Sequence, residues 1–221
     1  MRSAAMRMFP PSDRDRIAEA VRQAESKTAG EIVPYVVHQS DHYEVAEWRA
    51  GFLLGGCAFL GMTVARSFES AWIPFDPVMI AALTLLASAI GMLAVRFVPA
   101  LLRVCAGKHL IDRRVEARAA EAFISEEVFH THGRTGILIY LSLLERRVLV
   151  VGDSGINAKV QTEDWHGIIH RVVEGIRRGK PADGLVDAIL QCGTLLERHG
   201  VARGKGKTDE LANDLRIGRD G

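Results

Sequence analysis

Cysteine is scarce in this sequence, and the cysteines present form no recognisable pair. The three of them, Cys57, Cys105 and Cys192, are far apart, and no Cys-x-x-Cys spacing occurs. The pattern therefore indicates neither a zinc site nor a disulfide framework. Cys57 lies inside an apolar run, where a free cysteine usually packs as a small hydrophobic residue. Cys105 follows a second apolar run, where acylation is a weaker alternative.

The familiar catalytic and nucleotide-binding signatures are also missing. The sequence has no phosphate-binding glycine loop, dinucleotide fingerprint, nucleophile elbow or His-Glu-x-x-His segment. It also lacks a surplus of positive charge, because 28 basic residues face 27 acidic ones. A general nucleic-acid-binding protein would carry such a surplus, so we expect no nucleic-acid partner. The segment from Met1 to Pro11 contains no apolar stretch, and we expect no cleavable signal peptide.

Two long uncharged runs are prominent instead, Gly51 to Ala65 and Pro77 to Val95. As helices, the first would be short for a bilayer core of about 30 Å and the second would be long enough. The alternative is a pair of buried helices in a soluble core. The rest of the chain is too small, however, to wrap two helices that are apolar on every face. The sequence therefore predicts a transmembrane hairpin, with helices at 50–66 and 77–102 and an external loop at 67–76.

The basic residues predict an orientation for this hairpin. Arg66 is the one basic residue at the connecting loop. The opposite end carries five membrane-proximal basic residues: Arg49, Arg103, Lys108, Arg113 and Arg114. Positively charged flanks favour the cytoplasmic side, so we expect both termini and the soluble domain in the cytoplasm and the hairpin in a bacterial inner membrane. The same residues could attract anionic lipid head groups or form an ordinary solvated face.

Small residues at a spacing of four would let membrane helices approach closely. They occur as two pairs, Gly51 with Gly55 and Ala87 with Gly91. Their expected use is packing of the hairpin against itself, and a homodimer contact is the alternative. Neither run carries a central acidic residue or histidine, so nothing indicates an ion or proton path. The aromatic residues beside the runs suit an interfacial belt: Trp48, Trp72 and Phe75.

The remaining sequence alternates between helical and strand patterns. Helices are predicted at 12–27, 112–130, 162–178 and 181–199, and strands at 31–38, 136–144 and 148–151. Pro34 favours an edge or a bulge for the first strand. The two later strands are apolar enough to be central, with helices on both faces.

The helix and strand before the hairpin cannot bury a core alone and need the later elements. We therefore predict an α/β sandwich, with a small central sheet flanked by helices on both faces, whose crossover connection is interrupted by the transmembrane hairpin. Its discontinuous domain would comprise residues 9–47 and 107–200, followed by a flexible tail at 201–221.

Scattered residues of these elements form a pattern of their own. They are Glu25, Thr28, Gly30 and Glu31, the segment from Thr135 and Gly136 to Tyr140, then Ser142, Glu145, Arg146, Gly152, Asp153 and Trp165. Together they resemble the TPM-domain family, and most closely its bacterial membrane-anchored branch, in which predicted spans interrupt the domain. The likeness covers roughly residues 9–200 and includes no catalytic signature, so the catalytic residues are unknown.

The resemblance implies an α/β sandwich and several activities known among relatives. Some exported or chloroplast members are linked to photosystem maintenance, weak acid phosphatase activity and divalent-metal binding, and an animal relative is an accessory subunit of a membrane receptor. Many soluble members carry a Val-x-Asp segment before the first helix. Met8-Phe9-Pro10 stands in that place here, so one acidic group of the family site is missing. This departure weakens the transfer of phosphatase activity.

The end of the last strand is the best candidate for chemistry. Asp153 follows Gly152 there, and Asn157, Glu163 and Asp164 are close in sequence. Oxygen ligands of this kind suit Ca²⁺ or Mg²⁺, so Asp153, Asn157 and Asp164 form a predicted divalent-cation site. The alternative is that Asp153 simply forms a turn.

Two other groups of polar residues could form sites, but ordinary structural roles also explain them. His130 and His132 could ligate a transition metal, but nothing nearby completes such a site, and a solvated loop is favoured. Glu25, Thr28 and Glu31 could cluster at the same sheet edge as Asp153, or could serve as helix-end and turn residues.

The sequence therefore favours a membrane-anchored interaction or accessory module. Its expected role is in the assembly or maintenance of membrane protein complexes. Its expected partners are the lipid bilayer, a membrane protein and, through the hairpin, a second copy of the chain. The alternative function is a divalent-metal-dependent phosphatase using Asp153 and neighbouring acids.

Overall fold

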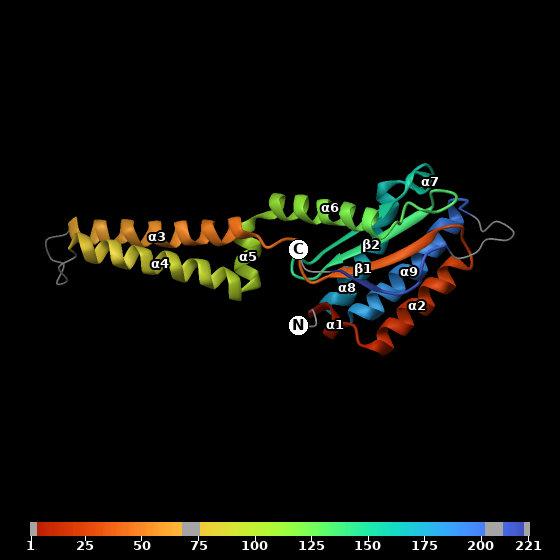
Figure 1. Ribbon diagram of the computed structural model, residues 1–221, viewed down its shortest axis with the longest axis horizontal. Helices are drawn as coiled ribbons and strands as arrows, with labels where there is room; N and C mark the ends of the chain where they lie inside the picture. Colours follow the sequence, from red (N-terminus) through yellow and green to blue (C-terminus); the bar gives the residue numbers. More distant parts are fainter. Residues whose placement is uncertain (1–3, 68–75, 202–209, 219–221) are drawn as a thin grey trace. The chain divides into compact units, whose positions relative to one another are not determined.

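The computed structural model describes residues 4–67, 76–201 and 210–218. Most of the expected external loop, with Trp72 and Phe75, lies outside these residues. The chain divides into two units, one formed by Met1–Asp41 with Arg114–Gly221 and the other by His42–Arg113. The first unit contains the sheet, and the second contains the two long apolar helices (Figure 1).

A four-stranded mixed sheet forms the centre of the first unit. Its strands are β1 (Glu31–Val37), β2 (Gly136–Ser142), β3 (Arg147–Gly152) and β4 (Arg216–Ile217), in the order β3-β2-β1-β4. β1 and β2 run parallel, whereas β3 returns antiparallel to β2. Because a parallel pair needs a long crossover connection, the chain between β1 and β2 can accommodate the whole second unit.

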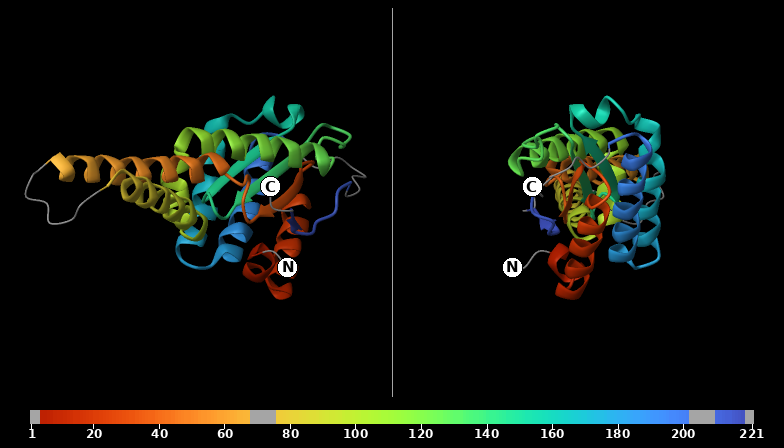
Figure 2. Two further views of the ribbon diagram at one scale, coloured as in Figure 1. Left: turned by 60° about the vertical axis from the view of Figure 1, so that its left-hand side comes forward. Right: turned by 90° about the vertical axis from the view of Figure 1, so that its right-hand side faces the viewer.

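Helices cover both faces of this sheet (Figure 2). α2 (Pro11–Glu25), α8 (His166–Arg177) and α9 (Pro181–Arg198) lie on one face. α6 (Lys108–Ser125), which belongs to this unit from Arg114 onward, lies on the other. The short helices α1 (Ala4–Met8), α7 (Ser154–Asn157) and the 3-10 helix η1 (Thr162–Trp165) complete the unit. The predicted α/β sandwich is confirmed.

The two sheet faces differ in chemistry. Towards α2, α8 and α9 the strands bury an aliphatic core that includes Ile32, Ile139 and Leu141. Alternate residues of a strand point to the opposite face, which carries Tyr35 and Tyr140 with stacked rings 5.8 Å apart. Every residue of β1 and β2 is buried, as expected for strands covered on both faces.

Pro34 lies within β1, which β4 flanks on the side away from β2. On that side the N–H of Ile32 donates to the Glu25 carboxylate, and the carbonyl of Val36 accepts from Gly218. Pro34 lies between these two residues, so its missing N–H also falls on that side. β4 is too short to need a donor there. Of the two expectations for Pro34, an edge or a bulge, the edge position was wrong because β1 lies between β2 and β4. The proline nevertheless occupies the side of β1 with the fewest sheet hydrogen bonds.

Two further predictions about the sheet are corrected. The tail expected to be flexible supplies β4, and Leu215 beside it is buried. β3 is an edge strand and not a central one, because it lies at the end of the strand order, beside β2. Five of its six residues are half-buried, which explains why an apolar sequence alone suggested a central position.

An ion pair within the first unit joins the two points at which the chain leaves for the second unit and returns from it. Asp41 and Arg114 are the two residues at which the first unit is interrupted, and their side chains lie 3.0 Å apart. The ends of the insertion are therefore neighbours. This proximity explains how the insertion leaves the parallel pairing of β1 and β2 intact.

The second unit consists mainly of α3 (Glu44–Ser67) and α4 (Pro77–Phe97), each long and apolar enough to cross a membrane. Only 17% of the most apolar stretch of either helix is buried. Phe52 is 74% exposed and Leu85 is 71% exposed. α3 begins before the predicted span at 50–66, because the helix continues through the polar turn from Glu44 to Arg49.

Glycines bring α3 and α4 into backbone contact. A methyl group on Gly91 would lie 2.7 Å from the carbonyl oxygen of Ala50, and one on Gly55 would lie 2.0 Å from Ser88 Oγ. Gly51 is similarly close to Met92. The close approach expected from the small residues therefore occurs within the hairpin.

The predicted span at 77–102 is divided into two helices. α4 ends at Phe97, Val98 is extended with φ −116° and ψ 96°, and α5 (Pro99–Ala106) follows. Proline disfavours a helical conformation in the residue before it, which accounts for the break. The apolar composition of 97–102 concealed this in the sequence.

Candidate functional site

Asp153 lies where β3 ends, at the edge of the sheet where β1 and β2 begin. Its side chain is buried and caps α7, because Oδ1 accepts a hydrogen bond of 2.6 Å from Ser154 N–H. Oδ2 lies 2.9 Å from Nε of Arg134. The Arg134 guanidinium also lies over the ring of Phe129, 5.7 Å from its centre. A positive charge therefore already occupies one side of the carboxylate, which supports the turn alternative.

Asn157 and Asp164 take part in local hydrogen bonds. Nδ2 of Asn157 donates to the carbonyl of Gly152 at 2.7 Å, and Oδ2 of Asp164 accepts from Gln161 N–H at 2.9 Å. Among residues 4–67, 76–201 and 210–218, no three His, Cys, Asp or Glu side chains lie close enough together to hold a metal ion. The cation site at Asp153, Asn157 and Asp164 stays a prediction.

The residues of the scattered sequence pattern gather largely at this same edge. The Glu25 carboxylate accepts from Ile32 N–H at 2.6 Å and so joins the end of α2 to β1. Thr28 donates to the carbonyl of Val201 at 2.6 Å. The Glu31 carboxylate accepts from Leu211 N–H at 3.4 Å. These contacts connect the start of β1 to the end of α2 and to the segment after α9, and they support the turn and helix-end alternative.

The start of β2 is held in the same way. Thr135 donates through Oγ1 to the carbonyl of Ala29 at 2.8 Å. Gly136 lies so close to Val128 that a methyl group on it would be 1.9 Å from the Val128 carbonyl oxygen. Trp165, the last residue of the pattern, is part of the aliphatic core. The pattern therefore marks positions that assemble the fold.

A buried polar network lies at the opposite end of the sheet, and its role was not predicted. Ser40 N–H donates to the Glu145 carboxylate at 2.7 Å, and Ser142 Oγ donates to the same carboxylate. Ser40 Oγ lies 2.9 Å from both Tyr140 Oη and Ser142 Oγ. Burial raises the pKa of Tyr140, so the phenol remains neutral and able to donate. The network fixes the chain just before it leaves for the second unit.

Glu145→Ala is expected to destabilise the sheet domain by about 2–4 kcal/mol, because it leaves buried donors on Ser40 and Ser142 without an acceptor. Denaturant unfolding of the purified protein measures this. Glu19→Ala is the control, because Glu19 forms an exposed ion pair with Arg22 and should contribute at most about 1 kcal/mol. Equal effects of the two substitutions would contradict the role given to Glu145.

The five membrane-proximal basic residues have different environments. Arg49 donates to the carbonyl oxygens of Cys105 and Ala106 at 3.1 and 2.9 Å, at the end of α5. Arg114 pairs with Asp41. Lys108 and Arg113 are exposed, and Arg103 is half-buried. Arg49 therefore has a structural contact in addition to its expected influence on orientation.

The two histidines of the loop before β2 are not brought together with further ligands. His130 is 81% exposed, with Nδ1 3.9 Å from the Glu127 carboxylate. His132 N–H donates to the Glu210 carboxylate at 2.7 Å. Their surroundings fit the solvated-loop alternative.

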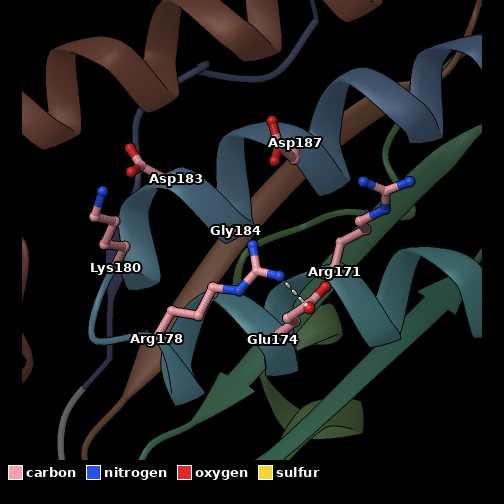
Figure 3. Close-up of a pocket in the computed structure, with 8 residues that line it drawn as sticks. Arg171, Glu174, Arg178, Lys180, Asp183, Gly184 and Asp187 are labelled. Carbon is pink, nitrogen blue, oxygen red and sulfur yellow. Dashed lines mark hydrogen bonds and ion pairs between the residues drawn. The ribbon is translucent and has the colours of Figure 1, made fainter.

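A charged hollow of about 310 Å³ lies between α8 and α9 (Figure 3). Arg178 pairs there with Glu174 at 2.5 Å, and Asp183 pairs with Arg16 of α2 at 2.6 Å. The opposite charges around the hollow largely satisfy one another, so it has no strong preference for an anion or a cation. Sequence reasoning missed the hollow because its residues come from the facing sides of two helices.

The fold and this sheet edge define an α/β sandwich whose characteristic residues hold the strand ends together. The sequence model of the TPM domain matches residues 100–195. This match agrees with the resemblance to the TPM-domain family that the sequence pattern indicated.

A solved structure shares the fold. It is the NMR structure of the BA42 protein from the psychrophilic bacterium Bizionia argentinensis sp. nov., with a TM-score of 0.57, 19% identity and 95% of each chain covered. At this identity the likeness concerns the fold alone. No curated protein matches the chain.

Proposed function

We propose that this protein is a membrane-anchored TPM-domain module that serves as an accessory to membrane protein complexes. The observation that carries the proposal is the exposure of α3 and α4, whose most apolar stretches are only 17% buried. A soluble protein rarely exposes an apolar surface of this extent. A bilayer would cover it, with α3 and α4 crossing the hydrocarbon core.

The charges at the hairpin support one orientation. Arg49 and Arg103 lie at the end where α3 begins and α5 follows α4, together with Lys108. Arg66 is at the far end of α3. The excess of positive charge at the first end favours a cytoplasmic position for the TPM-like domain and both termini.

An accessory role fits the way the sheet edge is built. The carboxylate of Asp153 is held by Ser154 and Arg134, and Glu25 caps the start of β1. Such groups give the domain a fixed shape and leave its surface for contact with a neighbouring membrane protein. This arrangement supports the proposed roles in the assembly or maintenance of membrane complexes.

Cross-linking in intact membranes, followed by purification of the full-length chain, tests the proposal. We expect a discrete product that contains the chain and another membrane protein. The same preparation is assayed for phosphate release from a generic ester with Mg²⁺, Ca²⁺ or Mn²⁺. A chain that forms no such product, and that turns over the ester in a manner abolished by Asp153→Ala, would overturn the proposal in favour of a phosphatase.

A further inference from the structure

An apolar groove runs along the second unit between α3, α4 and α5. It has a volume of about 300 Å³, and its walls include Leu53 and Leu54 of α3, Ala94 of α4, and Leu101 and Cys105 of α5. Every side chain that lines it is a hydrocarbon or a thiol. The groove therefore offers no hydrogen-bonding side chain beyond thiols and suits a hydrocarbon ligand.

The groove results from the break between α4 and α5. α5 packs against both α3 and α4, with Leu102 and Ala106 buried. Leu54 and Leu101 remain 43% and 41% exposed, so the groove is open on its outer side. An empty groove would forfeit dispersion contacts along its walls, which a chain of methylene groups would restore.

Positive charge lies at one end of this groove. Arg49 directly precedes the lining residue Ala50 and donates to the carbonyls of Cys105 and Ala106. An apolar groove with an arginine at its end complements a lipid in which an acyl chain continues from an anionic head group.

A second copy of the hairpin fits this surface less well. Close helix association in membranes relies on small residues at the contact. Gly51, Gly55 and Gly91 are already used within the hairpin, where added methyl groups would meet Met92, Ser88 and the Ala50 carbonyl. The outer side of the groove instead presents the larger side chains of Leu53, Leu54 and Leu101.

We propose that this groove binds one acyl chain of an anionic phospholipid, with the phosphate near Arg49. The inference rests on the proposed function, because it requires the hairpin to lie in a bilayer. It adds a specific lipid and a specific site to that general placement.

Native mass spectrometry of the full-length protein tests the proposal, after extraction into micelles containing equal amounts of phosphatidylglycerol and phosphatidylcholine. We expect one retained phosphatidylglycerol per chain. Ala94→Leu places a larger side chain in the groove and should lower this retention about tenfold or more. Ala82→Leu makes the same change at an exposed position of α4 outside the groove and should leave retention unchanged. Arg49→Gln should reduce the preference for phosphatidylglycerol over phosphatidylcholine.

Cysteine labelling provides a second measurement. It uses the unaltered protein, so a folding defect of a variant cannot affect the result. Cys57 and Cys105 line the groove, whereas Cys192 is buried in the sheet domain. Phosphatidylglycerol should slow alkylation of Cys57 and Cys105 at least about threefold relative to phosphatidylcholine, because the bound lipid covers both thiols. Cys192 should stay unlabelled in both lipids, because burial also raises the pKa of its thiol.

Each outcome separates the inference from the proposed function. Equal lipid retention by Ala94→Leu and Ala82→Leu, with unprotected cysteines, would overturn the lipid site while the chain remains in the membrane fraction. A wild-type dimer that Ala94→Leu dissociates would overturn it in favour of a second copy. Recovery of the wild-type chain outside the membrane fraction would overturn both.

Discussion

The double variant Leu86→Arg, Ile90→Arg is expected to be lost from the membrane fraction. Both residues lie on α4 and are more than half exposed, at 56% and 51%. Replacing an aliphatic residue with arginine near the centre of a span costs about 3–4 kcal/mol, so the pair should cost about 6–8 kcal/mol. Quantifying the chain in membrane and soluble fractions after expression measures the effect.

Ile124→Arg is the matched control for this variant. Ile124 is 64% exposed on α6, outside both candidate spans, and should tolerate arginine without a change in distribution. If α3 and α4 were exposed to water, both variants would behave alike, because charged substitutions at solvated positions are nearly neutral. An unchanged distribution of the double variant would therefore contradict the membrane hairpin.

Gly136→Ala is expected to destabilise the sheet domain by about 3 kcal/mol or more. The added methyl group would lie 1.9 Å from the carbonyl oxygen of Val128, and that backbone cannot move without disturbing the start of β2. The free energy of unfolding in denaturant is the measurement. The result would show that a residue of the family pattern is required for packing.

Gly167→Ala supplies the comparison for Gly136→Ala. A methyl group on Gly167 has no neighbour within 4 Å, and the residue lies in α8. Alanine is favoured over glycine in a helix by about 1 kcal/mol, so this variant should be neutral or slightly more stable. Similar denaturation midpoints for both variants would contradict the tight packing at Gly136.

Much of the fold followed from the sequence because its largest signals are local. Apolar periodicity identified the long helices and the three main strands, and the parallel pairing of β1 and β2 explains how a crossover holds the inserted unit. β4 could not be predicted, because two residues carry no period and become a strand only by pairing with Tyr35 and Val36. The break before Pro99 was predictable in principle but was hidden by the apolar residues around it.

The candidate site was harder to predict because its contacts join distant parts of the chain. Asp153 was correctly placed at a strand end, but its neighbour Arg134 is brought there by the β2–β3 pairing. Ser40 and Glu145 are 105 positions apart, and no local pattern indicated their hydrogen bond. Side-chain contacts of this kind depend on tertiary packing that periodicity does not contain.

Protease protection in sealed, inverted membrane vesicles tests the central claim most directly. If α3 and α4 cross the membrane with the TPM domain on the cytoplasmic side, protease should remove tags from both termini and leave a protected fragment containing both helices. Complete digestion of the chain, or its release from the vesicles into solution, would contradict the membrane-anchored TPM domain.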